Sequence, residues 1–201
     1  MTCSKMHSSL VPACRAATTI LAFACVAIAD PTALASAEDE AAMIEDALTA
    51  APPDIRETAT VKDFEGNVLR EGSGTYTCYP SPDGIAGPMC LDPEWERWMA
   101  AWMAQEPFTP SRLAIAYMMA GDSPHGGASN IDPFATEPTP DNDWVVEGPH
   151  VMIIVPDQSV LEGLPETPDS VEPYVMWPDT DYAHIMLPVD ERPEQRPIPS
   201  Q

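Results

Sequence analysis

The strongest hydrophobic pattern in the chain lies between residues 92 and 104, where apolar side chains recur at the spacing of one helix face. They are Trp95, Trp98, Met99, Trp102 and Met103. Asp92 is a strong N-cap and Pro93 suits the first helical position, so a helix is predicted to begin here. Each indole buries roughly 150–250 Å². The face is therefore expected to pack across a sheet, or else to form a platform for a carbohydrate or an aromatic ligand.

Alternating and β-branched segments predict strands on both sides of this helix. They cover 58–64, 68–70 and 75–79 before it, and 112–120, 144–146, 150–155, 174–177 and 182–189 after it. A short helix is expected at 38–50, where Pro52 and Pro53 end it. This order predicts an α+β fold, with a mostly antiparallel sheet and one Trp-rich amphipathic helix packed on a face.

Two long polar connections interrupt the strands. Residues 121–143 form the longer one, and long loops in compact domains are usually functional or disordered. His125, Asn130 and Asp132 could there bind a small ligand or a hard cation. Asn130 and Asp132 could equally form Asx turns. The second connection, 156–172, is rich in proline and acids and could hold one helical turn near Val160.

The first 37 residues have the pattern of a secretory signal peptide. Lys5 and Arg15 supply positive charge, residues 16–28 are apolar, and an A-x-A site at 35–37 precedes Glu38. The apolar stretch is shorter than the roughly 20 residues that span a bilayer. We therefore expect export to the periplasm or the medium without a membrane span.

The chain then divides into three further parts. They are a helix and linker (38–54), one globular domain (55–189) and a disordered tail (190–201). The formal net charge of −23 disfavours contact with nucleic acid and anionic lipid.

Cleavage would reduce the five cysteines to Cys78 and Cys90. In an oxidising compartment these two are expected to form a disulfide. Closing a loop of this length is worth on the order of 3 kcal/mol, and the bridge would fix the start of the Trp-rich helix. A thiol–metal site and a redox pair remain alternatives.

Several short motifs together resemble those of an uncharacterised family of exported bacterial proteins. They are Thr77-Cys78, Met89-Cys90-Leu91-Asp92, Ser129-Asn130-Ile131-Asp132-Pro133-Phe134-Ala135, Gly148-Pro149-His150-Val151-Met152 and Tyr174-Val175-Met176-Trp177. The resemblance spans about residues 55–188. It implies export and a single domain, and no activity, cofactor or catalytic residue.

The sharpest chemical pattern is a pair of H-x-M segments, because residues i and i+2 of a strand share a face. His150 with Met152, and His184 with Met186, could supply imidazole and thioether ligands to one copper ion, especially Cu(I). We expect Val175 opposite His184, which would turn Met176 to the other face. Ordinary core packing of these residues is the alternative.

The sequence contains no G-x-S-x-G nucleophile motif and no catalytic residue that we can name. We therefore expect a non-enzymatic binding or interaction module of the cell envelope, with an unknown protein or small molecule as its partner. A periplasmic copper-binding protein and a hydrolase with an unrecognised carboxylate site are the alternatives. For the hydrolase, the abundance of acids, Glu94 and Glu96 among them, makes any pairing uninformative.

Overall fold

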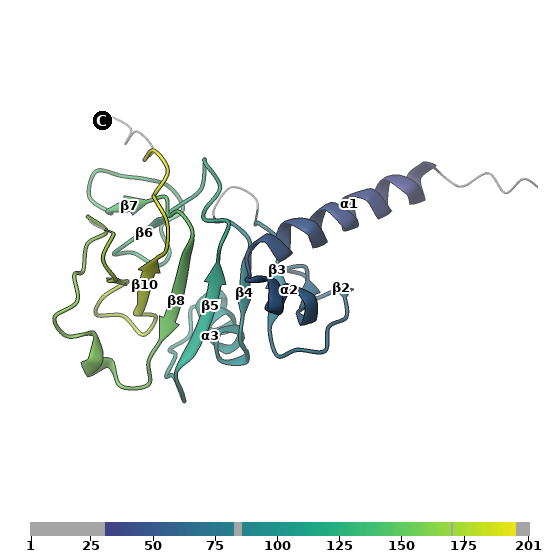
Figure 1. Cartoon of the computed structure of the whole chain (residues 1–201). Coiled ribbons are helices and arrows are strands. Elements are labelled where there is room, and N and C mark those ends of the chain that lie inside the picture. The colour runs from purple at the N-terminus through teal and green to yellow at the C-terminus, as the bar shows by residue number, and fades with distance from the viewer. Residues whose placement is uncertain (1–30, 83–85, 170, 196–201) are drawn as a thin grey trace, which may run out of the picture.

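An eight-stranded sheet runs through the molecule (Figure 1). The computed structural model describes residues 31–82, 86–169 and 171–195, and side chains from residue 37 onward. In the order β2-β1-β3-β4-β5-β8-β10-β9, the neighbouring strands are antiparallel except for β1 and β3. This arrangement confirms the predicted α+β class.

The strands of this sheet are β1 (Thr60–Lys62), β2 (Val68–Arg70), β3 (Thr77–Tyr79), β4 (Met89–Leu91), β5 (Ala114–Met118), β8 (His150–Ile154), β9 (Tyr174–Met176) and β10 (His184–Pro188). A separate antiparallel pair consists of β6 (Ala128–Ser129) and β7 (Trp144–Val145). It lies within and just after the long connection 121–143.

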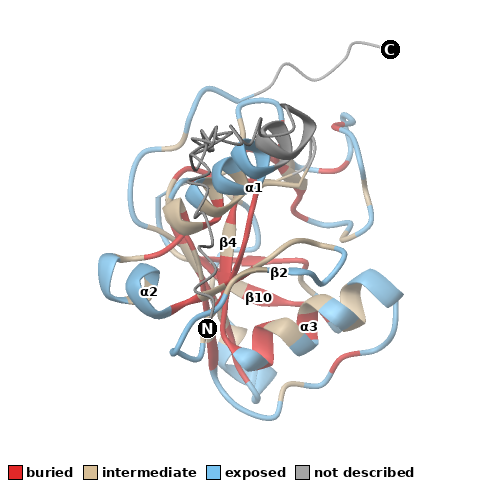
Figure 2. Cartoon of the chain, turned by 90° about the vertical axis from the view of Figure 1, so that its right-hand side faces the viewer, coloured by how far each residue is buried: buried red, intermediate tan, exposed pale blue. Residues whose placement is uncertain are grey.

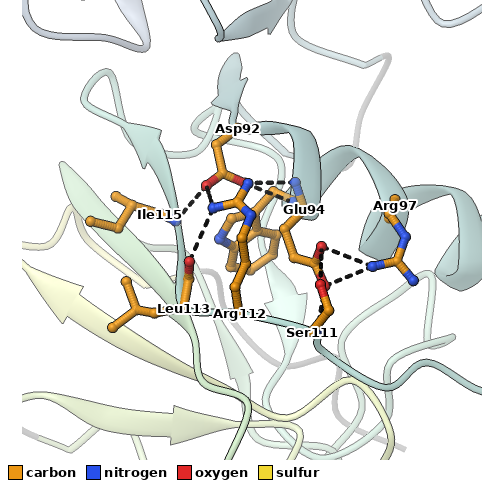
Figure 3. Close-up of polar contacts among 8 residues, drawn as sticks. Asp92, Glu94, Arg97, Ser111, Arg112, Leu113 and Ile115 are labelled. Carbon is orange, nitrogen blue, oxygen red and sulfur yellow. Dashed lines mark hydrogen bonds and ion pairs between the residues drawn. The ribbon is translucent and has the colours of Figure 1, made fainter.

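Helix α3 (Pro93–Ala104) begins at the predicted cap (Figure 3). One oxygen of Asp92 accepts hydrogen bonds from the backbone N–H groups of Glu94 and Trp95, at 2.9 and 3.0 Å. A cap of this kind stabilises a helix by about 1 kcal/mol. The other oxygen of Asp92 accepts from Arg112 at 3.0 Å, which ties the start of the helix to the segment that enters β5.

Glu94 fixes the same helix from its first turn (Figure 3). Its buried carboxylate accepts from the backbone N–H of Ser111 at 2.7 Å and from Arg97 at 2.8 Å. The indoles of Trp95 and Trp98 are thereby held against the sheet, where both are buried. The predicted packing of the Trp-rich helix is confirmed.

The two faces of the sheet pack against different helices, because side chains alternate between the faces along each strand. On β3 and β4, Tyr79 and Leu91 join the core beneath α3, whereas Cys78 and Cys90 join a smaller core beneath α1 (Pro31–Thr49). Figure 2 shows the buried strands between the two helices.

The disulfide between Cys78 and Cys90 confirms the predicted pairing. The two residues face each other across β3 and β4, with their Cα atoms 4.0 Å apart. The sequence did not predict β4, because Met89–Leu91 is only three residues long and lies between a Pro- and Gly-rich loop and a helix cap. Its strand conformation comes from pairing with β3 and β5.

The ends of the domain differ from expectation. Pro53 starts a short helix, α2 (Pro53–Thr58), instead of belonging to a linker, since proline is well suited to the first helical position. The described part of the expected tail, 190–195, is held against the domain. Gln195 exchanges hydrogen bonds with the backbone of Val146 at 2.9 and 3.0 Å. The predicted turn in 156–172 is the 3-10 helix η1 (Gln158–Leu161).

Most of the predicted signal peptide, residues 1–30, lies outside the described residues. Helix α1 includes the expected cleavage site at 35–37, and cleavage stays a prediction. Within the described ranges, no helix is both long and apolar enough to cross a membrane.

Candidate functional site

A cavity of about 310 Å³ lies between α3, the sheet and the connection 121–143, which we call the cover loop. Four tryptophans and seven methionines line it. They are Trp95, Trp98, Trp102, Trp177, Met89, Met99, Met103, Met118, Met152, Met176 and Met186. We call this space the tryptophan–methionine cavity. Its volume lies at the lower end of the range of small-molecule sites, which are typically concave and mostly apolar.

Three of these indoles are almost parallel. Trp98, Trp102 and Trp177 have ring centroids 5.5–6.2 Å apart and interplanar angles of 2–11°. Trp98 and Trp102 are one helical turn apart on α3, and Trp177 follows β9, so the group joins the helix to the sheet. Parallel rings at these distances form an aromatic wall for a flat molecule.

The same indoles hold the cover loop in place. Trp102 Nε1–H donates to the carbonyl oxygen of Pro133 at 2.8 Å, and Trp177 Nε1–H donates to that of Ser129 at 2.6 Å. The backbone N–H of Trp177 also donates to the Asn130 carbonyl at 2.8 Å. The long connection is therefore an ordered cover that lines the cavity and is fixed to its aromatic wall.

The three predicted ligand residues of this loop do not form one site. Asn130 is fully buried, and its side-chain amide donates to the carbonyl of Glu166 at 2.6 Å. Asp132 accepts from the backbone N–H of Phe134 at 2.9 Å, which is the Asx-turn alternative, although Asp132 also lines the cavity. His125 is exposed and does not line the cavity. Asn130 is thus a structural residue of the cover loop.

His184 packs against three of the four cavity indoles. Its ring centroid is 5.2, 5.5 and 5.4 Å from those of Trp95, Trp98 and Trp177, each at an angle near 84°. Its Nδ1–H donates to the carbonyl oxygen of Tyr182 at 2.9 Å, and its buried Nε2 has no hydrogen-bond partner. Burial lowers the pKa of this imidazole to about 4, so the ring is neutral at physiological pH.

The strand register separates the two predicted H-x-M segments. Met152 and Met186 are direct cross-strand neighbours, but His150 lies opposite Pro188, four residues from His184 along β10. Four residues of a strand span about 13 Å, whereas each metal–nitrogen bond is only about 2 Å long. One ion therefore does not reach both imidazoles, and the predicted four-ligand set is corrected on this point.

The second correction concerns Met176. It lies directly opposite His184 and so shares its face, where Val175 had been expected. The difference of one residue arises in the turn between β9 and β10, where Trp177 and Asp179 adopt positive φ angles of 56° and 60°. A shift of one residue moves every side chain of a strand to the other face.

One end of the cavity is polar, and most of its residues were not predicted as site residues from the sequence. Glu147, 1% exposed, accepts hydrogen bonds from the Tyr174 hydroxyl at 2.7 Å and from Arg192 at 2.8 Å. Burial raises the pKa of Tyr174, and the charge of the hydrogen-bonded Glu147 carboxylate adds to this. Glu147 was recognisable as a single acid inside the apolar segment 144–155. Its partners lie 27 and 45 residues away, and no local pattern indicates them.

Asp122 adds a second carboxylate at this end, and it exchanges two hydrogen bonds with the backbone of Glu147. The Asp122 N–H donates to the Glu147 carbonyl, and the Glu147 N–H donates to Asp122 Oδ2, both at 2.8 Å. Burial raises the pKa of Asp122 and the charge of Glu147 adds to this, although His150 acts in the opposite direction. Asp122, Glu147 and His150 all line the cavity.

Among the described residues, no three or more His, Cys, Asp or Glu side chains are grouped so that they could hold a metal ion. Comparison of the chain with protein-family models, with curated proteins and with solved structures found no match.

Proposed function

We propose that this chain is an exported binding protein that holds one small, apolar, flat molecule in the tryptophan–methionine cavity. The observation that carries the proposal is the cavity itself. Four indoles and seven thioethers are among the side chains that line a space of about 310 Å³. Indoles give flat, rigid contact area, and methionine side chains adapt to irregular ligands.

Two buried donors support a ligand that also carries a hydrogen-bond acceptor. The indole N–H groups of Trp95 and Trp98 have no hydrogen-bond partner within the protein. A buried donor without an acceptor costs about 1–3 kcal/mol. A ligand hydroxyl or carbonyl oxygen that reaches these N–H groups would supply the missing acceptor.

Export to the periplasm or the medium is part of the proposal. The Cys78–Cys90 disulfide supports it, because disulfides persist in oxidising compartments.

The hydrogen bonds of two buried acids favour binding over hydrolysis, whereas the raised pKa of Asp122 is compatible with the hydrolase alternative. Glu147 accepts hydrogen bonds from Arg192 and Tyr174, so its carboxylate is already engaged as an acceptor within the protein. Glu94 is likewise held by Arg97 and Ser111. Carboxylate-based hydrolysis needs one acid free to protonate a leaving group.

The test is a fluorescence titration with N-phenyl-1-naphthylamine, a neutral aromatic probe that brightens in apolar surroundings. We expect saturable binding at one site per chain. Trp102→Ala should weaken it at least about tenfold, the loss typical of a buried aromatic anchor. Trp144→Ala is the matched control, because Trp144 does not line the cavity. Circular dichroism verifies that both variants fold.

Two results would contradict the proposal. One is the absence of saturable binding to the folded parent protein. The other is an equal loss of affinity in Trp102→Ala and Trp144→Ala. A parallel titration with cellobiose examines the carbohydrate alternative, and saturable binding of cellobiose but not of the aromatic probe would replace the proposed ligand class.

A further inference from the structure

One imidazole and two thioethers gather on a single face of β9 and β10. His184 and Met176 are direct cross-strand partners, and Met186 is two residues from His184 on the same strand. Side chains directly opposite each other have Cβ atoms about 4.5–5.5 Å apart. All three residues are buried and line the tryptophan–methionine cavity.

The hydrogen bonding of His184 leaves one ring nitrogen available. A backbone carbonyl can only accept, so the bond from Nδ1 to the Tyr182 oxygen places the proton on Nδ1 and the lone pair on Nε2. This is the arrangement of metal-binding histidines, whose second ring nitrogen usually donates to a carbonyl or a carboxylate. Nε2 is buried and has no hydrogen-bond partner, which is uncommon for a buried polar atom.

A fourth candidate donor lies beside this group. Met152 of β8 is the direct cross-strand partner of Met186 on the side away from β9. The face therefore presents one nitrogen and three sulfur atoms across three neighbouring strands. Thioether sulfur is a soft ligand that suits Cu(I) and does not suit Mg²⁺ or Ca²⁺.

We propose that His184, Met176 and Met186 bind one Cu(I) ion in the wall of the cavity, with Met152 next to the site. The inference does not rest on the proposed apolar ligand, because it concerns a cation, although His184, Met176 and Met186 line the same cavity. It replaces the set of His150, Met152, His184 and Met186 expected from the sequence with one that the strand register permits.

The experiment is an anaerobic titration of the full mature protein with Cu(I) in the presence of bicinchoninate, a coloured competing chelator. Ascorbate serves as the reductant because it leaves the disulfide intact. We expect the protein to remove one equivalent of Cu(I) from the chelator. Tryptophan fluorescence should fall in parallel, since three indole centroids lie 5.2–5.5 Å from the His184 ring.

Substitutions identify the ligands. Met176→Leu and Met186→Leu nearly conserve side-chain volume and should each lower the Cu(I) affinity at least tenfold. Met118→Leu is the control, because Met118 lines the same cavity but lies on β5, opposite His150, and it should bind as the parent does. Thermal unfolding of the metal-free variants verifies that all three retain the fold.

Two outcomes would overturn the Cu(I) site. The first is a parent protein that removes no Cu(I) from the chelator. The second is unchanged affinity in both Met176→Leu and Met186→Leu. Either result combined with saturable binding of N-phenyl-1-naphthylamine would refute the metal site alone and leave the proposed function standing.

Discussion

The indole N–H of Trp102 donates a hydrogen bond of 2.8 Å to the carbonyl oxygen of Pro133, which joins the last turn of α3 to the cover loop. Trp102→Phe keeps an aromatic ring but removes this donor. We expect faster amide hydrogen exchange at 131–135 in the variant, because the loop loses one of its attachments to the cavity wall.

Trp144→Phe is the control for this measurement. The Trp144 indole also donates to a loop carbonyl, that of Gly126, at 3.1 Å. Faster exchange should then appear around Gly126 and not at 131–135. Identical exchange patterns in the two variants would show that Trp102 does not hold the cover loop specifically.

The disulfide should contribute substantially to the stability of the domain. Cys78 and Cys90 are 12 residues apart in sequence, and closing a loop of about this length is worth about 3 kcal/mol. The double variant Cys78→Ala/Cys90→Ala should lose approximately that much unfolding free energy in urea. Reduction of the parent protein should give a similar loss. A difference below about 0.5 kcal/mol would argue against this role.

The ion pair of Glu147 and Arg192 should contribute more to the free energy of unfolding than an exposed ion pair does. Their side chains are 2% and 16% exposed. Arg192→Ala would leave the buried carboxylate without its counter-charge, which typically costs about 3–5 kcal/mol.

Lys62→Ala is the matched comparison, because Lys62 and Glu96 are 31% and 28% exposed in their pair and such pairs are worth about 0–1 kcal/mol. Urea unfolding of both variants measures the difference. Equal losses of unfolding free energy in the two variants would mean that the burial of Glu147 does not determine how much its ion pair contributes to stability.

The pKa of Asp122 predicts a pH-dependent effect. Burial, together with the charge of Glu147, raises this pKa above the ordinary value of 3.8. The unfolded chain therefore releases this proton at a lower pH than the folded chain. The Asp122 carboxyl favours folding most below pH 3.8, and its contribution is lost as the pH rises through the folded pKa.

Asp122→Asn tests this sign. The variant can keep an oxygen for the Glu147 N–H and carries no charge. Its unfolding free energy relative to the parent should increase between about pH 3.5 and pH 7. A relative stability that is constant or decreases over this range would contradict the assigned direction.

Local signals in the sequence were sufficient for α3 and for the disulfide. Asp92 caps the helix through its own neighbours, and the apolar spacing from Trp95 onward identifies the buried face. Cys78 and Cys90 were paired because the other cysteines lie in the predicted signal peptide. The helix prediction needs only residues that are close in sequence, and the disulfide prediction needs only the number of cysteines outside the predicted signal peptide.

The candidate site depends on contacts that local patterns do not contain. The register of β9 against β10 is set by the turn at 177–181, and it determines whether Met176 shares a face with His184. The ion pair of Glu147 and Arg192 joins residues 45 positions apart. The H-x-M segments correctly indicated residues of one sheet face, but not their separation along the strands.

The charge of the cavity lining predicts which ligands bind best. Its acidic residues are Asp122, Asp132 and Glu147, of which Glu147 is paired with Arg192 behind the lining, and no Lys or Arg is among the described residues that line it. Indole faces also attract cations. With one naphthalene body, affinity should decrease from 1-naphthylmethylamine to 1-naphthalenemethanol to 1-naphthoate, with about tenfold between the first and the last. Isothermal titration calorimetry at pH 7 measures this order, and stronger binding of the anion would contradict it.

The central claim, that a small apolar molecule occupies the tryptophan–methionine cavity, is tested most directly by methyl NMR of the protein labelled with ¹³C at its methionine methyl groups. Titration with 1-naphthalenemethanol should shift the resonances of methionines that line the cavity, such as Met118, Met152, Met176 and Met186. The resonances of Met43 and Met119, which do not line it, should stay in place. Shifts confined to Met43 and Met119, or no saturable shift at any methionine, would contradict the proposed binding site.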